Sequence, residues 1–460
     1  MESIHRMKLQ ARRLVALLLP LCSLLAAGRA HAATTFTPGD VFVSLKTGQV
    51  QWYHADGTFV GTLVGTVPGH AEGMGFDASS NLYVNHWCAD SFCLTGNTVE
   101  RFSPAGASLG VFGSGYSCNP TSIDFDAAGN VFVGQADCSG AILKFNAAGA
   151  PVTSFAAAPE NRGSMWIELA PDSCTVLYAS EGVKVKRYNV CANVQLTDFN
   201  AVPLPDRAYG MVILTDNTVL VADSSAIVRL DAGANVIQTY NTVEPGHIWF
   251  SVDVDLVSTA FWAANNYTSV VTKFDLATGA VLASINTGAP QFQVKAVAVF
   301  HAPGAVTRRG RMTGGGSIFT DSNDCAAGSG CSVPPGTRIT HGFELHCDAN
   351  RQPNSLEINI HDPINGKFHL EKLTGATCYY DPSINPTPPP ASFNTYVGKG
   401  AGSYNGVSGA SAEWTFTDAG QPGVNSRIKR LKITDASGNV IVFVPDPGHT
   451  LTFGAHQAHQ

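Results

Sequence analysis

The sequence predicts an all-β fold in which a ring of six four-stranded units is followed by a second, smaller β domain. Charged residues make up only 14% of the chain and Gly is abundant at 46, which favours strands and turns over long amphipathic helices. A four-stranded unit recurs at a steady spacing along the first two-thirds of the chain. The strand that the first unit lacks is found after the last unit, so the units are expected to close into a ring.

The N-terminus has the layout of a secretory signal peptide. Basic residues at 6–13 precede an apolar run at 14–27, and Ala30-His31-Ala32 then offers a cleavage site. We expect residues 1–32 to be removed and the mature protein to be secreted, either extracellular or periplasmic. Two alternatives stay open, a lipoprotein cysteine at Cys22 and a twin-arginine signal at 12–13.

The charge of the mature chain excludes several classes of partner. Removal of residues 1–32 leaves 23 basic and 34 acidic residues, a formal charge of −11. Nucleic acids and anionic membranes bind basic surfaces, so neither is expected as a partner. No later apolar run approaches the ~20 residues that span a bilayer, so no membrane insertion is expected. We expect a monomer.

The repeat identifies the architecture of the first two-thirds. One piece reads GMGFDASSNLYV from Gly73 and SIDFDAAGNVFV from Ser122, and a second strand pair follows each copy. Equivalent aromatic or leucine residues recur at separations of 43, 43, 42 and 44, at Phe102, Phe145, Tyr188, Leu230 and Phe274. Four strands in each unit of ~40–50 residues are typical of β-propeller blades.

The two ends of the repeat region predict how the propeller closes. The chain begins with GDVFVS, QVQWYHADG and FVGTL, which match the second, third and fourth strands of a blade. The absent first strand is QVKAVAVF at 293–300. Five complete units and this split one predict a six-bladed β-propeller over residues 36–302, closed by a C-terminal inner strand that leaves no open sheet edge.

The repeat also carries a resemblance to a known family. The stretch from Asp124 to Val133 has an Asp, a Gly-Asn turn and a closing Val in the order that NHL-repeat propellers show. The chain resembles these and the gluconolactonase-like (senescence-marker-like) propellers over residues 39–300. The resemblance implies the fold, and this fold hosts both enzymes and binding proteins.

A different composition begins after the propeller. Residues 303–310 are expected to be an exposed linker, 311–453 a β-sandwich-like module and 454–460 a tail. The segments TGGGSI, HGFELHCD and AEWTFTDAG resemble a module that recurs in secreted bacterial proteins. The glycines at 314–316 lack the Lys and the helix of a phosphate loop. We interpret them as positions where another part of the backbone approaches closely, in a tight hairpin or a bulge.

Cysteine usage agrees with export. Loss of Cys22 leaves ten cysteines, six before residue 200 and four after residue 320, so each domain can close its own disulfides. Hairpin geometry favours bridges between cysteines that are near in sequence. The predicted pairs are Cys88–Cys93, Cys118–Cys138, Cys174–Cys191, Cys325–Cys331 and Cys347–Cys378.

One residue resembles a metal ligand. Gluconolactonase-like propellers hold a divalent cation in the central channel, and Glu72 in AEGMGF resembles their metal-binding Glu. The equivalent positions in the other blades carry no carboxylate or amide: Thr121, Met165, Tyr209, Phe250 and Val294. No cofactor is otherwise required, and Ca²⁺ or another divalent cation is expected only if the chain is a lactonase.

Two functions follow from these residues. The first is a secreted, non-enzymatic binding or scaffold protein that uses the propeller mouth as its recognition surface. Its candidate binding residues are Trp87, Tyr209, His247 and Trp249, of which the Trp and Tyr rings would stack on the ligand. That extracellular ligand would be a protein, a peptide or a carbohydrate. The alternative is a metal-dependent lactonase or hydrolase that uses Glu72. No catalytic residue is predicted, and metal analysis would separate the two.

Overall fold

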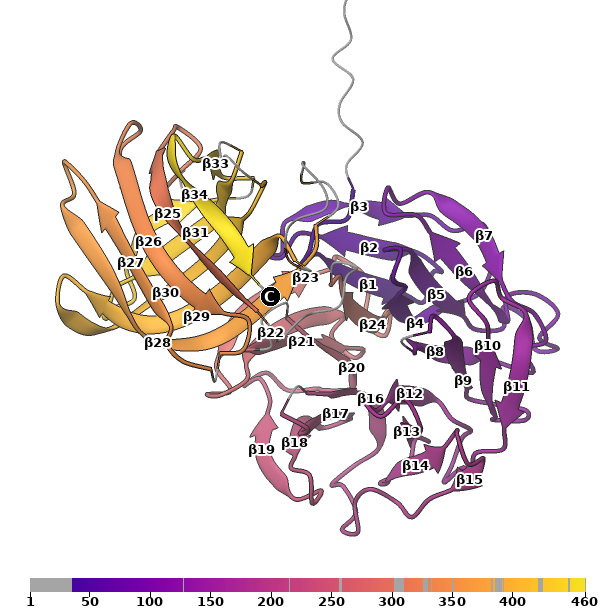
Figure 1. Ribbon diagram of the computed structural model, residues 1–460. Helices are drawn as coiled ribbons and strands as arrows, with labels where there is room; N and C mark the ends of the chain where they lie inside the picture. The colour runs from indigo at the N-terminus through magenta and orange to yellow at the C-terminus, as the bar shows by residue number, and fades with distance from the viewer. Residues whose placement is uncertain are drawn as a thin grey trace, which may run out of the picture. The chain divides into compact units, whose positions relative to one another are not determined.

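A computed structural model gives the architecture of the chain from residue 35 onward (Figure 1). The predicted signal peptide at 1–32 and nearly all of the expected linker at 303–310 lie outside the described residues. Every regular element within these residues is a β-strand. The described residues accordingly contain no helix that is long and apolar enough to cross a membrane. The structure describes residues 35–126, 128–214, 216–255, 259–301, 310–325, 330–331, 333–349, 351–381, 384, 391, 393–420, 425–445 and 447–459.

The first 24 strands form six four-stranded antiparallel sheets arranged as a ring (Figure 1). We number these blades in chain order and call the split blade, which contains both ends of the repeat, blade 6. Blade 1 comprises β4 (Ala71–Phe76), β5 (Leu82–His86), β6 (Thr98–Phe102) and β7 (Ser108–Phe112). Blade 2 comprises β8 (Pro120–Phe125), β9 (Val131–Gln135), β10 (Ile142–Phe145) and β11 (Pro151–Phe155).

The other blades repeat the pattern. Blade 3 comprises β12 (Trp166–Leu169), β13 (Thr175–Ala179), β14 (Val185–Asn189) and β15 (Val194–Gln195). Blade 4 comprises β16 (Ala208–Ile213), β17 (Val219–Asp223), β18 (Ala226–Leu230) and β19 (Val236–Tyr240). Blade 5 comprises β20 (Trp249–Val254), β21 (Ala260–Asn265), β22 (Val270–Asp275) and β23 (Val281–Asn286). Blade 6 comprises β24 (Val294–Val299), β1 (Val41–Leu45), β2 (Val50–Tyr53) and β3 (Phe59–Leu63).

Closure of the ring occurs as the sequence predicts. Strand β24 pairs antiparallel with β1, with Val299 opposite Val41 and Ala296 opposite Ser44. The innermost strands contact one another in an unbroken cycle around the ring: β4, β8, β12, β16, β20, β24 and β4 again. Strand β24 thus covers the edge of β1, and blade 6 gains the same four-stranded order as the other blades.

Hairpin turns within the blades use aspartate side chains as local hydrogen-bond acceptors. Asp126 accepts the N–H groups of Ala128 and Asn130, and its other oxygen accepts the Asn130 side-chain amide. Asp77 and Asn81 repeat this arrangement in blade 1. These residues of the repeat therefore form turns, which explains why an Asp recurs four residues before an Asn.

The C-terminal domain is a single ten-stranded antiparallel sheet that curls around its own core. The two layers expected of a sandwich-like domain are two parts of this continuous sheet, and Trp414, Phe368 and Tyr396 are buried between them. The strands are β25 (Arg311–Phe319), β26 (Arg338–His346), β27 (Ser355–Ile360), β28 (Gly366–Tyr379), β29 (Thr395–Tyr404), β30 (Val407–Thr417), β31 (Arg427–Thr434), β32 (Val440–Val444), β33 (His449–Thr450) and β34 (Phe453–His459).

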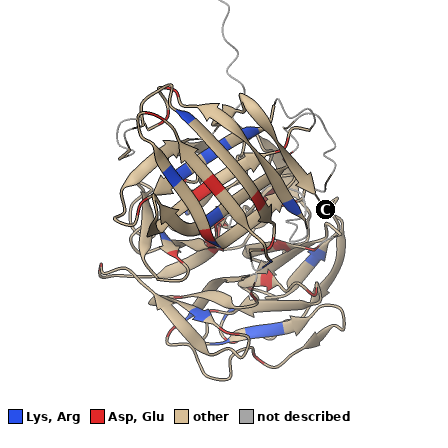
Figure 2. Cartoon of the chain, turned by 60° about the vertical axis from the view of Figure 1, so that its left-hand side comes forward, with Lys and Arg blue, Asp and Glu red and all other residues tan. Residues whose placement is uncertain are grey.

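Charged side chains of both signs are interspersed on this sheet (Figure 2). Glu413 of β30 pairs with Lys399 of β29 at 3.7 Å and with Arg430 of β31 at 3.8 Å. Such cross-strand pairs of opposite charge keep the outer face of the sheet solvated.

The predicted tail at 454–460 is wrong for the described residues. Strand β34 (Phe453–His459) pairs with β25 along seven residues, from Ser317 opposite Phe453 to Arg311 opposite His459. The side chain of His456 is fully buried. The segment belongs to the sheet because β25 would otherwise expose an unpaired edge.

The glycines at 314–316 lie in the middle of β25 rather than in a hairpin. Gly316 is opposite His341 of β26, and Gly314 is opposite His456 of β34. A Cβ atom on Gly314 would lie 3.2 Å from Cδ2 of His456 and 2.4 Å from the Ala455 carbonyl oxygen. Gly314 therefore makes room for the buried His456, whose Nε2 atom lies 2.6 Å from that of the buried His341.

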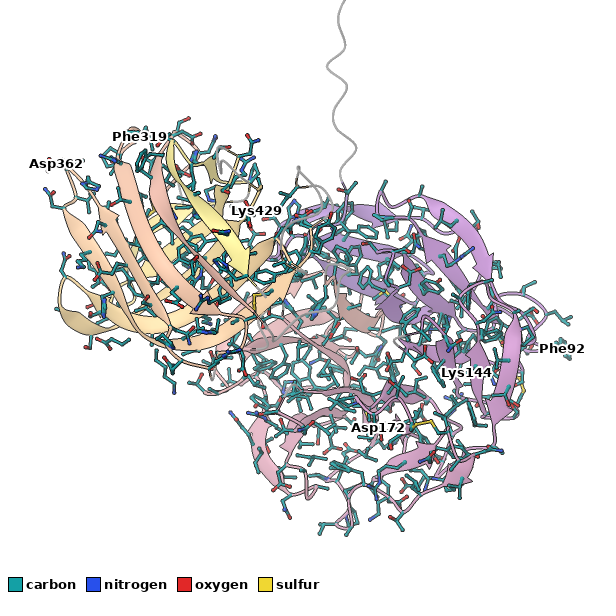
Figure 3. All side chains as sticks on the ribbon, viewed as in Figure 1. Phe92, Lys144, Asp172, Phe319, Asp362 and Lys429 are labelled. Atoms are coloured by element: carbon teal, nitrogen blue, oxygen red, sulfur yellow. A yellow bond between two sulfur atoms is a disulfide. The ribbon has the colours of Figure 1, made fainter. Side chains whose placement is uncertain are left out.

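All five predicted disulfides are present. Three lie in the propeller and two in the C-terminal domain, and none joins the two. The Cys88–Cys93 bridge closes a short loop from which Phe92 projects into solvent with 83% of its surface exposed (Figure 3). Asp90 orders the same loop by accepting the N–H groups of Phe92, Leu94 and Thr95.

Candidate functional site: a carboxylate-lined cavity in the propeller channel

The innermost strands share a local irregularity at one end of the channel. In five of the six blades the register with the second strand shifts near the start of the innermost strand, which is the mark of a β-bulge. A bulge inserts one residue and re-aims its side chain. The residues at or beside these positions are Glu72, Thr121, Tyr209, Phe250 and Lys295, and blade 3 contributes Met165 without a bulge.

These six side chains close one end of the channel, and we call them the plug. Tyr209 and Phe250 pack with ring centroids 4.5 Å apart. The Lys295 ammonium lies 5.1 Å from the Phe250 ring centroid and 3.6 Å from Oε1 of Glu72. Five of the six side chains are buried and Lys295 is half-buried, so the plug forms a packed wall rather than an open binding surface.

Glu72 thus lies where the sequence places it, but its partner is a cation of the chain itself. Its side chain is 2% exposed, and burial raises the pKa of the carboxyl while Lys295 lowers it. The equivalent residue in blade 6 is Lys295 and not Val294, which pairs with Leu45 and is buried between blades. The sequence alignment is off by one residue there because the bulge adds a residue to β24.

The structure does not assemble the predicted stacking residues into an exposed surface. Trp249 is fully buried and donates from Nε1 to Oδ1 of Asn241, and Tyr209 belongs to the plug. His247 stacks on Trp249 at 5.6 Å, while the Arg162 guanidinium lies over Trp87 at 4.8 Å. Tyr209 and Trp249 are therefore packing residues, because the blade contacts need large apolar side chains at these positions.

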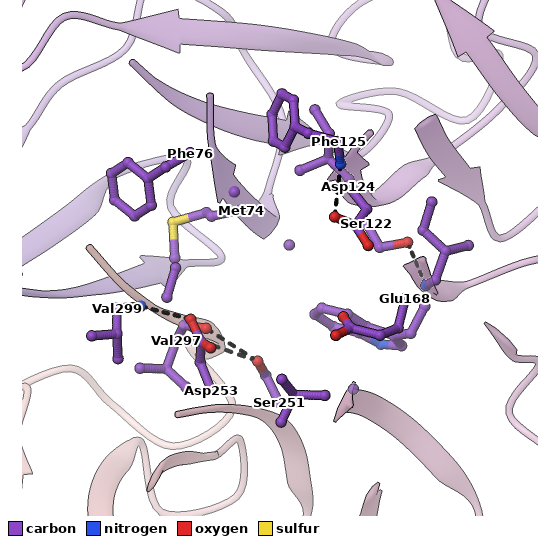
Figure 4. Close-up of a pocket in the computed structure, with 18 of the residues that line it drawn as sticks. Met74, Phe76, Ser122, Asp124, Phe125, Glu168, Ser251, Asp253, Val297 and Val299 are labelled. Atoms are coloured by element: carbon purple, nitrogen blue, oxygen red, sulfur yellow. Dashed lines mark hydrogen bonds between the residues drawn. The ribbon is translucent and has the colours of Figure 1, made fainter. Parts of the chain in front are cut away.

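Beyond the plug, the channel holds a cavity of about 420 Å³ (Figure 4). All six innermost strands line it. The polar lining is dominated by three carboxylates, Asp124 of β8, Glu168 of β12 and Asp253 of β20. Apolar residues fill much of the remaining wall: Met74, Phe76, Phe125, Trp166, Met211, Val252 and Val299. We call this space the channel cavity.

Each carboxylate bonds to the backbone of the next blade. Asp124 accepts the N–H of Leu169 at 2.5 Å, Glu168 that of Ile213 at 3.0 Å, and Asp253 that of Val299 at 2.7 Å. An innermost strand has no pairing partner on its channel side, so these side chains satisfy N–H groups that would otherwise lack an acceptor.

The electrostatics of the cavity favour the neutral form of these acids. Burial raises the pKa of Asp124 to about 6, and the nearby Asp253 carboxylate adds to the rise. The pKa of Glu168 is raised well above its ordinary value, first by burial and then by the charge of Asp124. Burial also raises the pKa of Asp253, whereas His301 at the cavity wall lowers it.

Sequence reasoning missed these three acids. They occur in the segments SIDFD, WIEL and SVDVD, where an acid interrupts an otherwise apolar alternation in three of the six innermost strands. An acid at one repeated position of a buried strand is the signal that could have found them.

A separate group in the C-terminal domain has ligand atoms close together. Oxygens of Asp321 and Asp324 and a ring nitrogen of His449 all lie within 4.8 Å of one another. His449 Nε2 is 2.6 Å from Oδ2 of Asp324, which also accepts the N–H of Asp321. The hydrogen bonds within this group tie the loop after β25 to β33.

Solved structures give distant likenesses to this chain. No known family profile and no curated protein matches the chain. A chain of the nidogen/laminin complex is similar with a TM-score of 0.45 and 12% identity, over 56% of this chain and 97% of that one. The WD40 β-propeller domain of Doa1 gives 0.42 and 14% identity, over 56% of this chain and 81% of that one.

A protein of unknown function from Bacteroides caccae gives a TM-score of 0.43 and 13% identity, over 57% of this chain and 98% of that one. Likenesses at this level carry no argument about function. The β-propeller fold of residues 36–300 rests on the strand pairing and on the closed cycle of innermost strands.

Proposed function

We propose that this protein is a secreted, non-enzymatic binding or scaffold protein whose propeller is the recognition module. The channel cavity carries the proposal, because all six blades contribute to a space of about 420 Å³ with a polar set of side chains on an apolar wall. Sites for small ligands are concave, mostly apolar and of ~300–1,000 Å³. A protein, peptide or carbohydrate ligand would enter this cavity with a side chain or a terminal group.

Secretion is supported by two features of the chain. The N-terminal 32 residues have the order of a signal peptide. The ten cysteines of the mature chain form five disulfides within the two domains, as is usual in an oxidising compartment.

A relation to NHL-repeat and gluconolactonase-like propellers is part of the proposal. It is supported by the recurring Asp-to-Asn turn, which Asp77 and Asp126 form in the same way. The lactonase alternative depends on Glu72 as a metal ligand. The contact of Glu72 with Lys295 favours the binding function, because a cation of the chain takes the place of the metal charge.

A blocking variant tests the binding function. Ala78 is exposed in the β4–β5 turn and lines the cavity, so Ala78→Trp should narrow its opening without disturbing the core. The matched control is Ala148→Trp, at an exposed turn outside the cavity. Both variants and the wild type would be screened by thermal shift against peptides, glycans, amines and lactones.

Ligands that stabilise the wild type and Ala148→Trp but not Ala78→Trp would support the proposal. Hydrolysis of a lactone that requires added metal and is lost in Glu72→Gln would favour the enzyme instead.

A further inference from the structure

The carboxylates of the channel cavity carry more charge than the fold requires. Their structural task is to accept N–H groups of the next blade, and a neutral side chain can do the same. Ser122 accepts the N–H of Ile167 at 3.0 Å, and Ser251 accepts that of Val297 at 3.3 Å. Asn or Gln would accept equally well at the positions of the acids. The charge of Asp124, Glu168 and Asp253 therefore needs another explanation.

That charge is unfavourable in the empty protein. Several carboxylates that share one poorly solvated space raise each other's pKa, and each ionised group pays for lost hydration. No Lys or Arg lines the cavity among the described residues, and His301 is the sole basic side chain at its wall. A cation from outside would supply the missing charge.

A second observation concerns the same wall. Trp166 lines the cavity, is 7% exposed, and its Nε1–H finds no acceptor among the described residues. The rings of Phe76 and Phe125 also line the cavity. Aromatic rings next to carboxylates form the surroundings that bind ammonium ions, by charge and by cation–π attraction. A ligand that also carries an oxygen would offer an acceptor for Nε1.

The spacing of the carboxylates distinguishes between kinds of cation. A single bare metal ion needs its oxygen ligands within about 2.6 Å of itself, hence within about 5 Å of one another. Among the described residues, the group of three that meets such a spacing is Asp321, Asp324 and His449, and not the three acids of the cavity. An organic cation spans a wider gap, and its carbon chain suits the apolar part of the wall.

We infer that the channel cavity binds a small organic cation, an alkylammonium group, between the carboxylates of Asp124, Glu168 and Asp253. The inference rests on the proposed binding function and names the ligand chemistry of the same site. The ammonium group can belong to a free amine or to the side chain of a lysine in a peptide. Both would place the nitrogen among the carboxylates and the carbon chain against Met74 and Trp166.

Binding of this cation is coupled to protons. The titratable groups at the cavity are Asp77, Asp124, Glu168, Asp253 and His301. Because the pKa values of Asp124 and Glu168 are raised, these acids keep their protons up to a higher pH in the empty cavity than ordinary carboxyl groups do. An ammonium ion favours the ionised acids and displaces those protons. Affinity should therefore fall as the pH is lowered from 8 to 5, and binding should release protons.

Isothermal titration of the mature protein tests the inference. The probes are 1,4-diaminobutane, its neutral counterpart 1,4-butanediol, CaCl₂, and a peptide with one lysine in free and acetylated form. We expect the diamine or the free-lysine peptide to bind with a Kd at or below about 1 mM, and the diol and the acetylated peptide not to bind. Titration in buffers of different ionisation enthalpy should show proton release.

Substitutions of the cavity acids test whether the amine binds in the channel cavity. Glu168→Gln and Asp124→Asn keep the backbone hydrogen bonds and should each weaken amine binding about tenfold. Asp231→Asn is the matched control, because Asp231 likewise accepts backbone N–H groups but lies in an exposed turn outside the cavity lining.

Three results would overturn the inference: no amine binds, the diol binds as well as the diamine, or Ca²⁺ binds while the amines do not. A neutral or anionic ligand that Ala78→Trp excludes would overturn the inference while leaving the proposed binding function intact. If the two neutralised variants bind amines like the wild type, the cavity is not the site.

Discussion

Glu72 and Lys295 come from opposite ends of the repeat region and meet in the plug, with Oε1 and Nζ 3.6 Å apart. Glu72 belongs to the first complete blade, and Lys295 belongs to the strand that completes the split one. The ion pair therefore spans the junction at which the ring closes.

Removing one charge of this pair should destabilise the propeller. Glu72→Gln would leave the Lys295 ammonium without its partner in a buried setting, at a cost of about 3 kcal/mol. Lys295→Met should cost a similar amount, and the double variant should recover most of the loss. Chemical denaturation of the four proteins gives the coupling energy. Additive losses would show that the two side chains do not interact.

Strand β24 should be indispensable to the ring. Its pairing with β1 adds a ladder of hydrogen bonds worth about 1 kcal/mol each, and each buried aliphatic side chain adds about 1.5–3 kcal/mol. These contributions are comparable to a whole domain's stability of about 5–15 kcal/mol. A chain that ends at Gly304 should fold as a soluble monomer, whereas one that ends at Thr287 should aggregate. Size-exclusion chromatography of both chains decides, and equal behaviour would refute closure by β24.

Acid should weaken the C-terminal domain through its buried histidines. Burial lowers the pKa of His341 to about 4, and burial beside His341 lowers the pKa of His456 as well. The unfolded chain therefore binds more protons, so stability is complete above pH ~6.5 and is lost as the pH falls toward 4. His341 alone should account for about 2 kcal/mol of this loss at pH 5, and His456 adds to it.

Hydrogen exchange of the β25 and β34 amides at pH 7.5 and 5 measures this loss. The double variant H341L/H456L provides the control, because it should show no such pH dependence. If its amides respond to acid like those of the wild type, other groups are responsible.

Neutralising a cavity acid should stabilise the free protein at alkaline pH. Glu168 has a raised pKa in the folded state, so the folded chain binds more protons, and stability falls as the pH rises above ~4.3. Glu168→Gln keeps the acceptor for the Ile213 N–H and should gain at least about 1 kcal/mol at pH 8 but little at pH 4. Thermal unfolding at both pH values checks this, and a loss of stability at pH 8 would contradict it.

The repeat made the ring predictable because its signals are local and recur. Core residues equivalent to Phe145 recur at separations of 42–44 through five units, and the turn of Asp126 and Asn130 is repeated by Asp77 and Asn81. The strand at 293–300 fits the gap in the split unit. Four of the disulfide pairs were predictable for the same reason, since each joins cysteines that a hairpin or a short loop brings together. Cys347 and Cys378 are 31 residues apart, and their pairing followed from their being the two cysteines that remain in that domain.

The channel was harder to predict because its lining depends on bulges. An extra residue reverses which face each side chain takes, so Lys295 lines the channel where simple alternation selects Val294. The segment at 454–460 was predicted as a tail because FGAHQAH contains few apolar residues, although Gly314 leaves the space that His456 needs.

The two ends of the ring leave it side by side. The N–H of Gly39 donates to the carbonyl oxygen of Phe300, and the N–H of Phe300 donates to that of Asp40, both at 2.8 Å. A domain whose two ends lie next to each other can be inserted into a surface turn of another protein without breaking a blade. It can also be circularly permuted, with its old ends joined and new ends made at a turn between strands. We therefore expect that residues 36–300 can be moved as one unit, and that the segments before and after them can be replaced without changes to the ring.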